Sequence, residues 1–175
     1  METPRTVYWD TALVVDNLIP EDMLSKMVED VRDDAINLIE DVVTGTPTDD
    51  TEYKASENNS FDYVLDWVLG QDLLPTLEGH EISGVARHHR LEKGGKMAWH
   101  EDHMYSIAVS VYLTSCVGGE IQICKNCGTQ SVLVEPKPNR IIVMKCDSYH
   151  RVLEVLDGER ESIQIFLKYI KLNGE

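Results

Sequence analysis

Basic residues are scarce in this chain, and long apolar runs are absent. The 175 residues include 16 Lys and Arg against 31 Asp and Glu, which gives a formal net charge of −15. Such a surface repels phosphate backbones and anionic lipid headgroups, so the composition disfavours nucleic acid and membrane surfaces as partners. No run approaches the roughly 18 to 20 consecutive apolar residues of a transmembrane helix.

A leader pattern, internal repeats and low-complexity segments are also missing. Residues 1–10 lack the charged region followed by an apolar region that a secretory signal peptide needs, so we expect a cytoplasmic protein. The chain has only 4 cysteines, which suit free thiols in a reducing compartment. Its length and its 42% hydrophobic content predict one domain spanning 1–175. The sequence gives no indication of an oligomeric state.

The first part of the chain predicts helices. A β-like run at 7–15 is followed by apolar residues at steps of three and four from 20 to 42, opposite an acidic face. A second helix is expected from 61, ending near Gly70 or continuing to Leu74, with capping candidates at 58–60. The polar stretch 44–60 between them predicts a long surface loop, either a lid or a linker.

The rest of the chain changes to short β-rich runs separated by turn residues. We expect strands at 82–89, 105–113, 120–124, 131–134, 140–145, 151–155 and 162–170. Many short strands with regular turns are typical of a sandwich, barrel or jelly roll. The predicted fold class is therefore α+β and mainly β, in which a helical support segment (1–80) leads into an all-β core (81–172).

Three side chains in the β-rich part form a candidate metal site. His100 and Asp102 lie two positions apart, so an extended segment projects both from one face while Glu101 points away. His150 begins an alternating apolar run, where a strand could present it from the opposite wall of a barrel. Two imidazoles and one carboxylate are the ligands of a facial Fe(II) site with open positions. His103 is a rival to His100, but in a strand it would face the same way as Glu101.

An arginine follows the second histidine of this set. The guanidinium of Arg160 stays charged in a protein and can bind a carboxylate through two parallel hydrogen bonds. Such a residue suits an organic-acid cosubstrate that lies beside the metal.

At these residues the sequence resembles the Fe(II)- and 2-oxoglutarate-dependent dioxygenases, and within them the prolyl 4-hydroxylase-like branch. The resemblance covers roughly 82–170, and its motifs occur in the family's order. They are His100-Glu-Asp102, similar to the metal-binding His-x-Asp; Val111-Tyr-Leu-Thr114 and Gly118-Gly-Glu120, similar to the Tyr-Leu-Asn and Gly-Gly-Glu elements; the turn and apolar strand at 134–144; and His150-Arg-Val-Leu-Glu-Val155 with Gly158-Glu-Arg160-Glu-Ser162, similar to the distal histidine and the cosubstrate arginine.

The resemblance implies a double-stranded β-helix (jelly roll) preceded by two N-terminal helices. It also implies that His100, Asp102 and His150 hold Fe(II) at the mouth of this fold. 2-Oxoglutarate would chelate the same metal, and Arg160 would bind its far carboxylate.

Two further residues and the activity are implied by the same resemblance. Ser162, two positions beyond the arginine, and Tyr112 would add hydrogen bonds at the cosubstrate. The implied reaction hydroxylates an unactivated C–H of a peptidyl substrate, prolyl included, or of a small molecule. It consumes O2 and 2-oxoglutarate, releases succinate and CO2, and uses ascorbate as a reductant.

The residues just before the metal motif differ from the prolyl hydroxylase pattern. That pattern has a tyrosine, Gly-Gln and a second aromatic residue, whereas this chain has Leu91, Gly94-Gly95 and Met97. The differences leave the iron chemistry intact and the substrate open. Two alternatives to the oxygenase are a non-catalytic jelly-roll binding module and a cupin-like metalloenzyme that does not use 2-oxoglutarate, which would not need Arg160.

Two other groups of residues, one aromatic and basic and one of cysteines, each have more than one interpretation. Trp99 and the run 87–90 (Arg-His-His-Arg) could line the entrance of the site, or they could be a core tryptophan and an exposed basic turn. The run 124–127 (Cys-Lys-Asn-Cys) resembles a zinc knuckle, but a structural zinc site needs four ligands and no second Cys-x-x-Cys pair exists. Cys116 and Cys146 could complete it, or a second copy of the chain could do so across a dimer. A redox-active pair is another reading, and a hairpin turn with free thiols is the one preferred.

Overall fold

The described part of the chain, residues 4–8, 11–41, 53–56, 60–124 and 130–172, is mainly β in this computed structural model. One sheet has eight strands in the order β1-β2-β11-β7-β14-β5-β4-β3, a second has four in the order β10-β9-β12-β6, and β13 pairs with β8. The strands are β1 (Arg5–Tyr8), β2 (Ala12–Asp16), β3 (Ile39–Asp41), β4 (Tyr53–Ala55), β5 (His80–Leu91), β6 (Met97–His100), β7 (Ile107–Tyr112), β8 (Val117–Gly118), β9 (Ile121–Cys124), β10 (Ser131–Val134), β11 (Arg140–Lys145), β12 (Tyr149–Val152), β13 (Val155–Asp157) and β14 (Arg160–Lys171).

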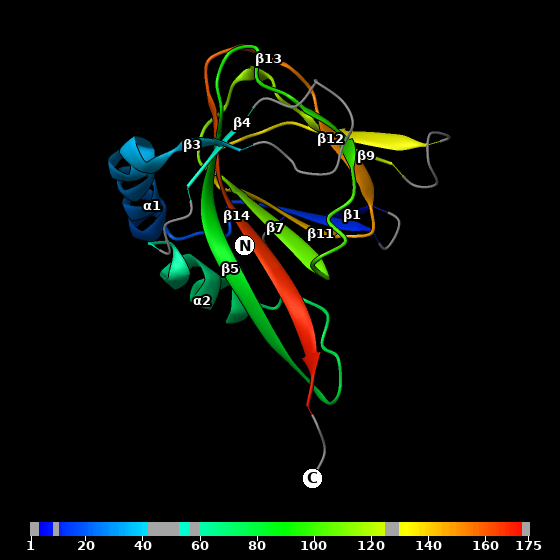
Figure 1. Cartoon of the computed structure of the whole chain (residues 1–175). Helices are drawn as coiled ribbons and strands as arrows, with labels where there is room; N and C mark the ends of the chain where they lie inside the picture. Colours follow the sequence, from blue (N-terminus) through cyan, green and yellow to red (C-terminus); the bar gives the residue numbers. More distant parts are fainter. Residues whose placement is uncertain (1–3, 9–10, 42–52, 57–59, 125–129, 173–175) are drawn as a thin grey trace.

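The helices cover one face of the large sheet, and the small sheet lies over its other face (Figure 1). Helix α1 (Glu21–Asp34) and helix α2 (Asp62–Leu69) contribute Met27, Val31, Phe61 and Val68 to a core shared with the large sheet. A second core lies between the two sheets. This layering of helix, sheet and sheet gives a jelly-roll-like molecule with an interior between its sheets.

Strand β14 shows how period-two alternation separates the two cores. Ile163, Ile165 and Leu167 belong to the core under the helices, whereas Phe166 packs in the core between the sheets. Successive side chains of a strand point to opposite faces. Residues 160, 162, 164 and 166 therefore share the inner face of the fold.

The N-terminal elements differ from the sequence prediction in two places. The run 7–15 is a hairpin of β1 and β2, closed by a hydrogen bond from the Thr11 N–H to the Tyr8 carbonyl oxygen (2.9 Å), and not one strand. The first helix ends at Asp34 and passes through a 3₁₀ turn, Ala35–Asn37, into β3, so the prediction of a helix up to 42 was too long. Backbone pairing of β3 with β4 provides hydrogen bonds that the helix pattern could not predict.

The second helix and the strands follow the prediction closely. Helix α2 lies within the expected range, although its N-cap is Phe61 and not a residue of 58–60, of which only Ser60 is described. Each expected strand is present: β10 and β11 have the expected ends, the other strands have shifted ends, and the run 151–155 is divided between β12 and β13. Strand β4 contradicts the loop prediction for 44–60 at 53–55, and most of that stretch lies outside the described residues. Neither described α-helix has the length and hydropathy that a bilayer crossing demands.

Candidate metal and cosubstrate site

Two neighbouring strands of the small sheet bring the histidines together. His100 closes β6 and His150 lies in β12, and the two residues are partners in the antiparallel register. Their ring centroids are 4.2 Å apart. His150 therefore comes from the adjacent strand, and the expectation that it faces His100 from the opposite wall was wrong. Nothing in the local sequence specifies the β6–β12 pairing.

Asp102 reaches the same point from a turn. Strand β6 ends at His100, so strand alternation does not hold as far as residue 102. The Asp102 N–H donates to the Cys146 carbonyl oxygen (2.9 Å), and its own carbonyl accepts from the Tyr105 N–H (3.0 Å). These hydrogen bonds fix the backbone of the turn and direct the carboxylate between the histidines.

The three side chains are spaced as ligands of one ion would be. The His100 Nε2 lies 3.9 Å from Asp102 Oδ1, and the His150 Nε2 lies 3.7 Å from Asp102 Oδ2. All three candidate ligand atoms lie within 4.8 Å of one another. An ion bound at about 2.1 Å joins atoms up to about 4 Å apart, so small side-chain rotations would bring all three onto it.

Backbone carbonyl groups orient both imidazoles. The Nδ1–H of His100 donates to the Ala98 carbonyl oxygen (2.7 Å), and that of His150 donates to the Ser148 carbonyl oxygen (2.8 Å). This pattern leaves the Nε2 lone pairs directed at Asp102, as metal-binding histidines require. Burial, with a contribution from His100, lowers the pKa of His150 to about 3, so its ring is neutral at pH 7. Burial raises the pKa of Asp102.

The rival ligands point elsewhere. His103 lies 3.1 Å from a Glu101 carboxylate oxygen and its side chain is 76% exposed. Neither residue belongs to the group of close ligand atoms. The preference for His100 and Asp102 over their neighbours therefore agrees with the geometry.

Arg160 lies in the interior, and its Nε–H has no hydrogen-bond acceptor among the described residues. It is 2% exposed, and its guanidinium donates to the Tyr112 hydroxyl (2.8 Å) and stacks over the ring of the same tyrosine. Among the described residues, nothing accepts a hydrogen bond from its buried Nε. A Cβ at Gly119, where φ is +70°, would lie 3.2 Å from the arginine Cδ, so the Gly-Gly element lets the backbone approach this side chain.

Ser162 does not line the cavity in which the cosubstrate is expected. It is fully buried, and its hydroxyl accepts a hydrogen bond from Gln164 Nε2 (3.0 Å). Gln164 in turn accepts from the Ser110 hydroxyl (2.7 Å). Gln164 and Ser110 line the cavity, whereas Ser162 does not.

A cavity of about 390 Å³ joins the metal cluster to Arg160 and is of a size suited to small molecules. The sequence reasoning missed most of its wall. The missed residues are Tyr53, Met97, Met104, Tyr105, Ala108, Ser110, Ile121, Met144, Val152, Gln164 and Phe166, whereas Arg87 and His89 belong to the run that was expected as one possible lining of the entrance. Alternation along β14 beyond Arg160 could have predicted Gln164 and Phe166.

The basic run of residues 87 to 90 is neither a turn nor exposed. It lies within β5, where Arg87 and His89 face the cavity and His88 faces the helices. His88 is fully buried, 3.4 Å from Asp34 and 3.7 Å from Glu161. One half of the run thus lines the cavity, while the other half packs against buried carboxylates.

Trp99 lines neither the cavity nor the core. Its ring stacks on Tyr149, with centroids 5.0 Å apart, and the Arg151 guanidinium lies over its face at 4.8 Å. Alternation places these three residues on the outer face of the small sheet, away from His150. Both interpretations of Trp99 were therefore wrong.

The cysteines show no four-ligand arrangement among the described residues. Cys124 is buried at the end of β9, Cys146 is buried between the sheets, and Cys116 is half-buried. Cys127 lies outside the described residues, so the zinc-knuckle alternative is not tested.

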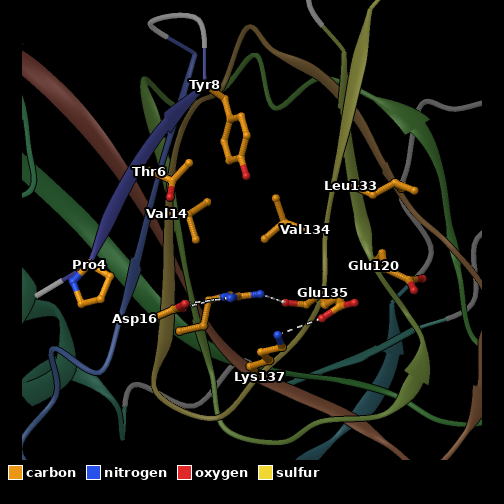
Figure 2. Close-up of a pocket in the computed structure, with 11 residues that line it drawn as sticks. Pro4, Thr6, Tyr8, Val14, Asp16, Glu120, Leu133, Val134, Glu135 and Lys137 are labelled. Carbon is orange, nitrogen blue, oxygen red and sulfur yellow. Dashed lines mark hydrogen bonds and ion pairs between the residues drawn. The ribbon is translucent and has the colours of Figure 1, made fainter.

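A second cavity, of about 350 Å³, lies between β1 and β10 (Figure 2). Its charged groups other than Glu120 pair with one another. Arg140 donates two hydrogen bonds to Asp16 (2.6 and 2.8 Å), and Lys137 pairs with Glu135 at 3.0 Å. Because these charges satisfy each other, the cavity with Arg160 is the better candidate for a functional site.

Comparison with known proteins agrees with this choice. Residues 84–168 match the model of the 2OG-Fe(II) oxygenase superfamily, and no curated protein sequence matches the chain. A Pseudomonas putida prolyl-4-hydroxylase is similar in structure, with a TM-score of 0.73, 17% identity, and coverage of 90% of this chain and 92% of that one.

Two further solved structures widen the comparison. A Trichoplax adhaerens prolyl hydroxylase, in complex with a peptide fragment of the hypoxia inducible factor oxygen degradation domain, has a TM-score of 0.75 at 12% identity, covering 93% of this chain and 84% of that one. The α-ketoglutarate-dependent epimerase SnoN from nogalamycin biosynthesis has a TM-score of 0.67 at 10% identity, covering 90% and 78%. At these identities the structural likeness shows the fold alone.

The family match spans the strands that carry the histidines and the arginine, and the turn that carries the aspartate. Enzymes of this superfamily use Fe(II), 2-oxoglutarate and O2. The match to the superfamily model, over just under half of the chain, therefore indicates a 2-oxoglutarate-dependent oxygenase, and the chain has the fold of the prolyl 4-hydroxylases.

Proposed function

We propose that this enzyme hydroxylates an unactivated C–H of a peptidyl or small-molecule substrate, with Fe(II) held by His100, Asp102 and His150. One oxygen atom of O2 enters the substrate and the other enters succinate, while the 2-oxoglutarate carboxyl group leaves as CO2. The bound metal and cosubstrate supply the oxidising chemistry. The protein contributes binding, orientation and exclusion of water.

The observation that carries the proposal is the convergence of three ligand atoms within 4.8 Å at one end of a cavity that also contains Arg160. The donor set suits Fe(II), because two neutral imidazoles and one carboxylate leave coordination positions open. The unused Nε of Arg160 suits a carboxylate, since a buried donor without an acceptor is costly.

The roles of the neighbouring residues follow from their contacts. Arg160 would bind the far carboxylate of 2-oxoglutarate, and the Tyr112 hydroxyl would hold the guanidinium in place through its hydrogen bond. Ser162 would support the wall through Gln164 rather than bind the cosubstrate directly. The carbonyl groups of Ala98 and Ser148 keep the imidazole protons on Nδ1.

The same proposal extends to the fold and the substrate. We infer that the two facing sheets are a double-stranded β-helix and that 1–175 work as one domain, because both cores include strands of the large sheet. The peptide bound to the Trichoplax adhaerens relative supports a peptide as one candidate substrate. SnoN supports a small molecule as the other.

The decisive experiment measures succinate formation from 2-oxoglutarate by the purified protein with Fe(II), ascorbate and O2. We expect slow turnover even without the substrate, and its loss in His150→Ala. His103→Ala is the matched control, since this exposed histidine stands one residue beyond Asp102 and outside the cluster. Absence of both turnover and 2-oxoglutarate binding in the wild type would overturn the proposal in favour of a binding module or a metalloenzyme without this cosubstrate.

A further inference from the structure

Arg87 is a second cation in the active-site cavity, and it has no assigned role. Its side chain lines the cavity from the inner face of β5 and is half-buried. Among the described residues, no carboxylate lies within ion-pair distance of it, and it has no hydrogen-bonded partner. By contrast, Arg90 on the same strand pairs with Glu161, and Arg140 pairs with Asp16.

The position of Arg87 separates it from the cosubstrate arginine. In the β5–β14 register Leu91 pairs with Arg160, whereas Arg87 pairs with Gln164. Four residues along a strand span about 13 Å, so the two guanidinium groups start from well-separated points on the wall. His89 lies between them and is uncharged, because burial, with contributions from Arg160, His88 and Arg87, lowers its pKa to about 3.

The charges of the loaded site leave Arg87 uncompensated. Asp102 is the only carboxylate among the described residues that line the cavity. With Fe(II) and 2-oxoglutarate bound, two positive charges of the metal and one of Arg160 balance the cosubstrate dianion and Asp102. The charge of Arg87 then remains in a partly buried site, where an unpaired charge is costly. This occurs in a chain whose net charge is −15.

The wall beside Arg87 is aromatic. Tyr53 stacks on His89 with ring centroids 5.2 Å apart, Phe166 lies 6.2 Å from the same ring, and Tyr105 lies 5.0 Å from Phe166. A ligand that fills this region therefore meets flat apolar surfaces together with a guanidinium group. Guanidinium groups bind carboxylates through paired, charge-assisted hydrogen bonds.

We propose that the substrate carries a carboxylate on an apolar body and that Arg87 binds this carboxylate. The inference rests on the proposed oxygenase function and narrows its substrate class to acids, either small molecules or peptides with a free carboxylate near the reacting C–H. Arg87 acts as a residue that determines specificity, whereas Arg160 holds the cosubstrate.

The test compares acids with their amides on protein loaded with Mn(II) in place of Fe(II) and with saturating 2-oxoglutarate. The probes are 3-phenylpropanoate with 3-phenylpropanamide, and the tripeptide Gly-Phe-Ala with its C-terminal amide. Broadening of the probe signals by Mn(II) in NMR titrations gives the dissociation constants. We expect at least one acid to bind at least tenfold more tightly than its amide. The acid–amide pair that shows this difference indicates whether the substrate is a small acid or a peptide with a free carboxylate.

Variants assign the preference to Arg87. Arg87→Gln should abolish the difference between acid and amide, and Arg87→Lys should keep part of it through its charge. Arg32→Gln, a matched change at an exposed position of α1, should keep it in full. Thermal unfolding of each variant checks that it is folded.

Three results would overturn the inference. They are equal binding of acids and amides by the wild type, an undiminished preference in Arg87→Gln, and a loss of 2-oxoglutarate affinity in Arg87→Gln as large as its loss of acid affinity. The last result would make Arg87 a cosubstrate residue. A wild-type protein that fails to bind 2-oxoglutarate at all would instead refute the proposed function, so the two failures are distinguishable.

Discussion

His100 and His150 are register partners on β6 and β12, and their ring centroids lie 4.2 Å apart with both Nε2 atoms near Asp102. Two imidazolium ions could not share this space, so at least one ring must be neutral. The lowered pKa of His150, about 3, is consistent with that requirement. The fold thus holds His150 in its neutral, metal-binding state before any ion arrives.

Metal should therefore stabilise the protein against unfolding. At a free Mn(II) or Zn(II) concentration 100 times the dissociation constant, mass action contributes about 2.7 kcal/mol, or a rise in Tm of roughly 5–10 °C for a chain of this size. We expect this rise in thermal unfolding scans of the wild type and of His103→Ala, and none in His150→Ala. An equal rise in His150→Ala would place the metal elsewhere.

Tyr112→Phe should weaken the binding of 2-oxoglutarate without affecting the metal. The change removes the hydroxyl that accepts a hydrogen bond from Arg160 at 2.8 Å. A hydrogen bond of about 1 kcal/mol corresponds to roughly a fivefold loss of affinity. Titration of 2-oxoglutarate into the Mn(II)-loaded protein measures it, with Tyr149→Phe as the control because that ring stacks on Trp99 outside the cavity. Unchanged affinity would show that Tyr112 does not position the guanidinium.

The local sequence pattern was sufficient to predict most helices and strands and the side chains of one wall of the site. Alternation in β14 puts Arg160 and Phe166 on the inner face, because strand geometry depends only on neighbouring residues. The pairing of β6 with β12 joins residues 50 positions apart, and backbone hydrogen bonds between strands carry no residue code. The sequence pattern therefore predicted which three side chains come together, but not how they meet.

The basic run at 87–90 also shows that local sequence does not specify tertiary partners. Its composition allowed either a lining of the site entrance or an exposed turn, yet buried partners determine its place, since His88 lies between Asp34 of α1 and Glu161 of β14. Those partners come from elements far away in the chain. Local composition could not predict that β5 would have Arg87 and His89 on its cavity side.

The stability of the metal-free protein should fall as the pH drops below about 6.5, and His89 should account for part of the loss. Its pKa is lowered to about 3 in the folded state, chiefly by burial, so below pH 6.5 the unfolded state binds a proton that the folded state does not. The loss approaches about 1.4 kcal/mol per pH unit per histidine well below that pH. Urea unfolding between pH 7 and pH 5 should show a smaller loss in His89→Gln than in the wild type. Identical losses would mean that the ring is solvated in solution.

Asp16→Asn should lower stability and leave the active site unaffected, because the Asp16–Arg140 pair joins β2 to β11 beside the second cavity (Figure 2). The carboxylate is 34% exposed, so we expect a loss of only about 1 kcal/mol in the free energy of unfolding at pH 7. Hydrogen bonding to Arg140 lowers the pKa of Asp16 below its ordinary value of 3.8, so its stabilising effect is present above that pH and disappears as the pH falls further. Urea unfolding at pH 7 and pH 3 should therefore show a difference in unfolding free energy between Asp16→Asn and the wild type that becomes smaller at pH 3.

The control for this prediction is Glu135→Gln, a change at an exposed carboxylate of the same cavity, which should leave the unfolding free energy unchanged at either pH. A loss of 2-oxoglutarate affinity in Asp16→Asn would instead connect this cavity to the reaction.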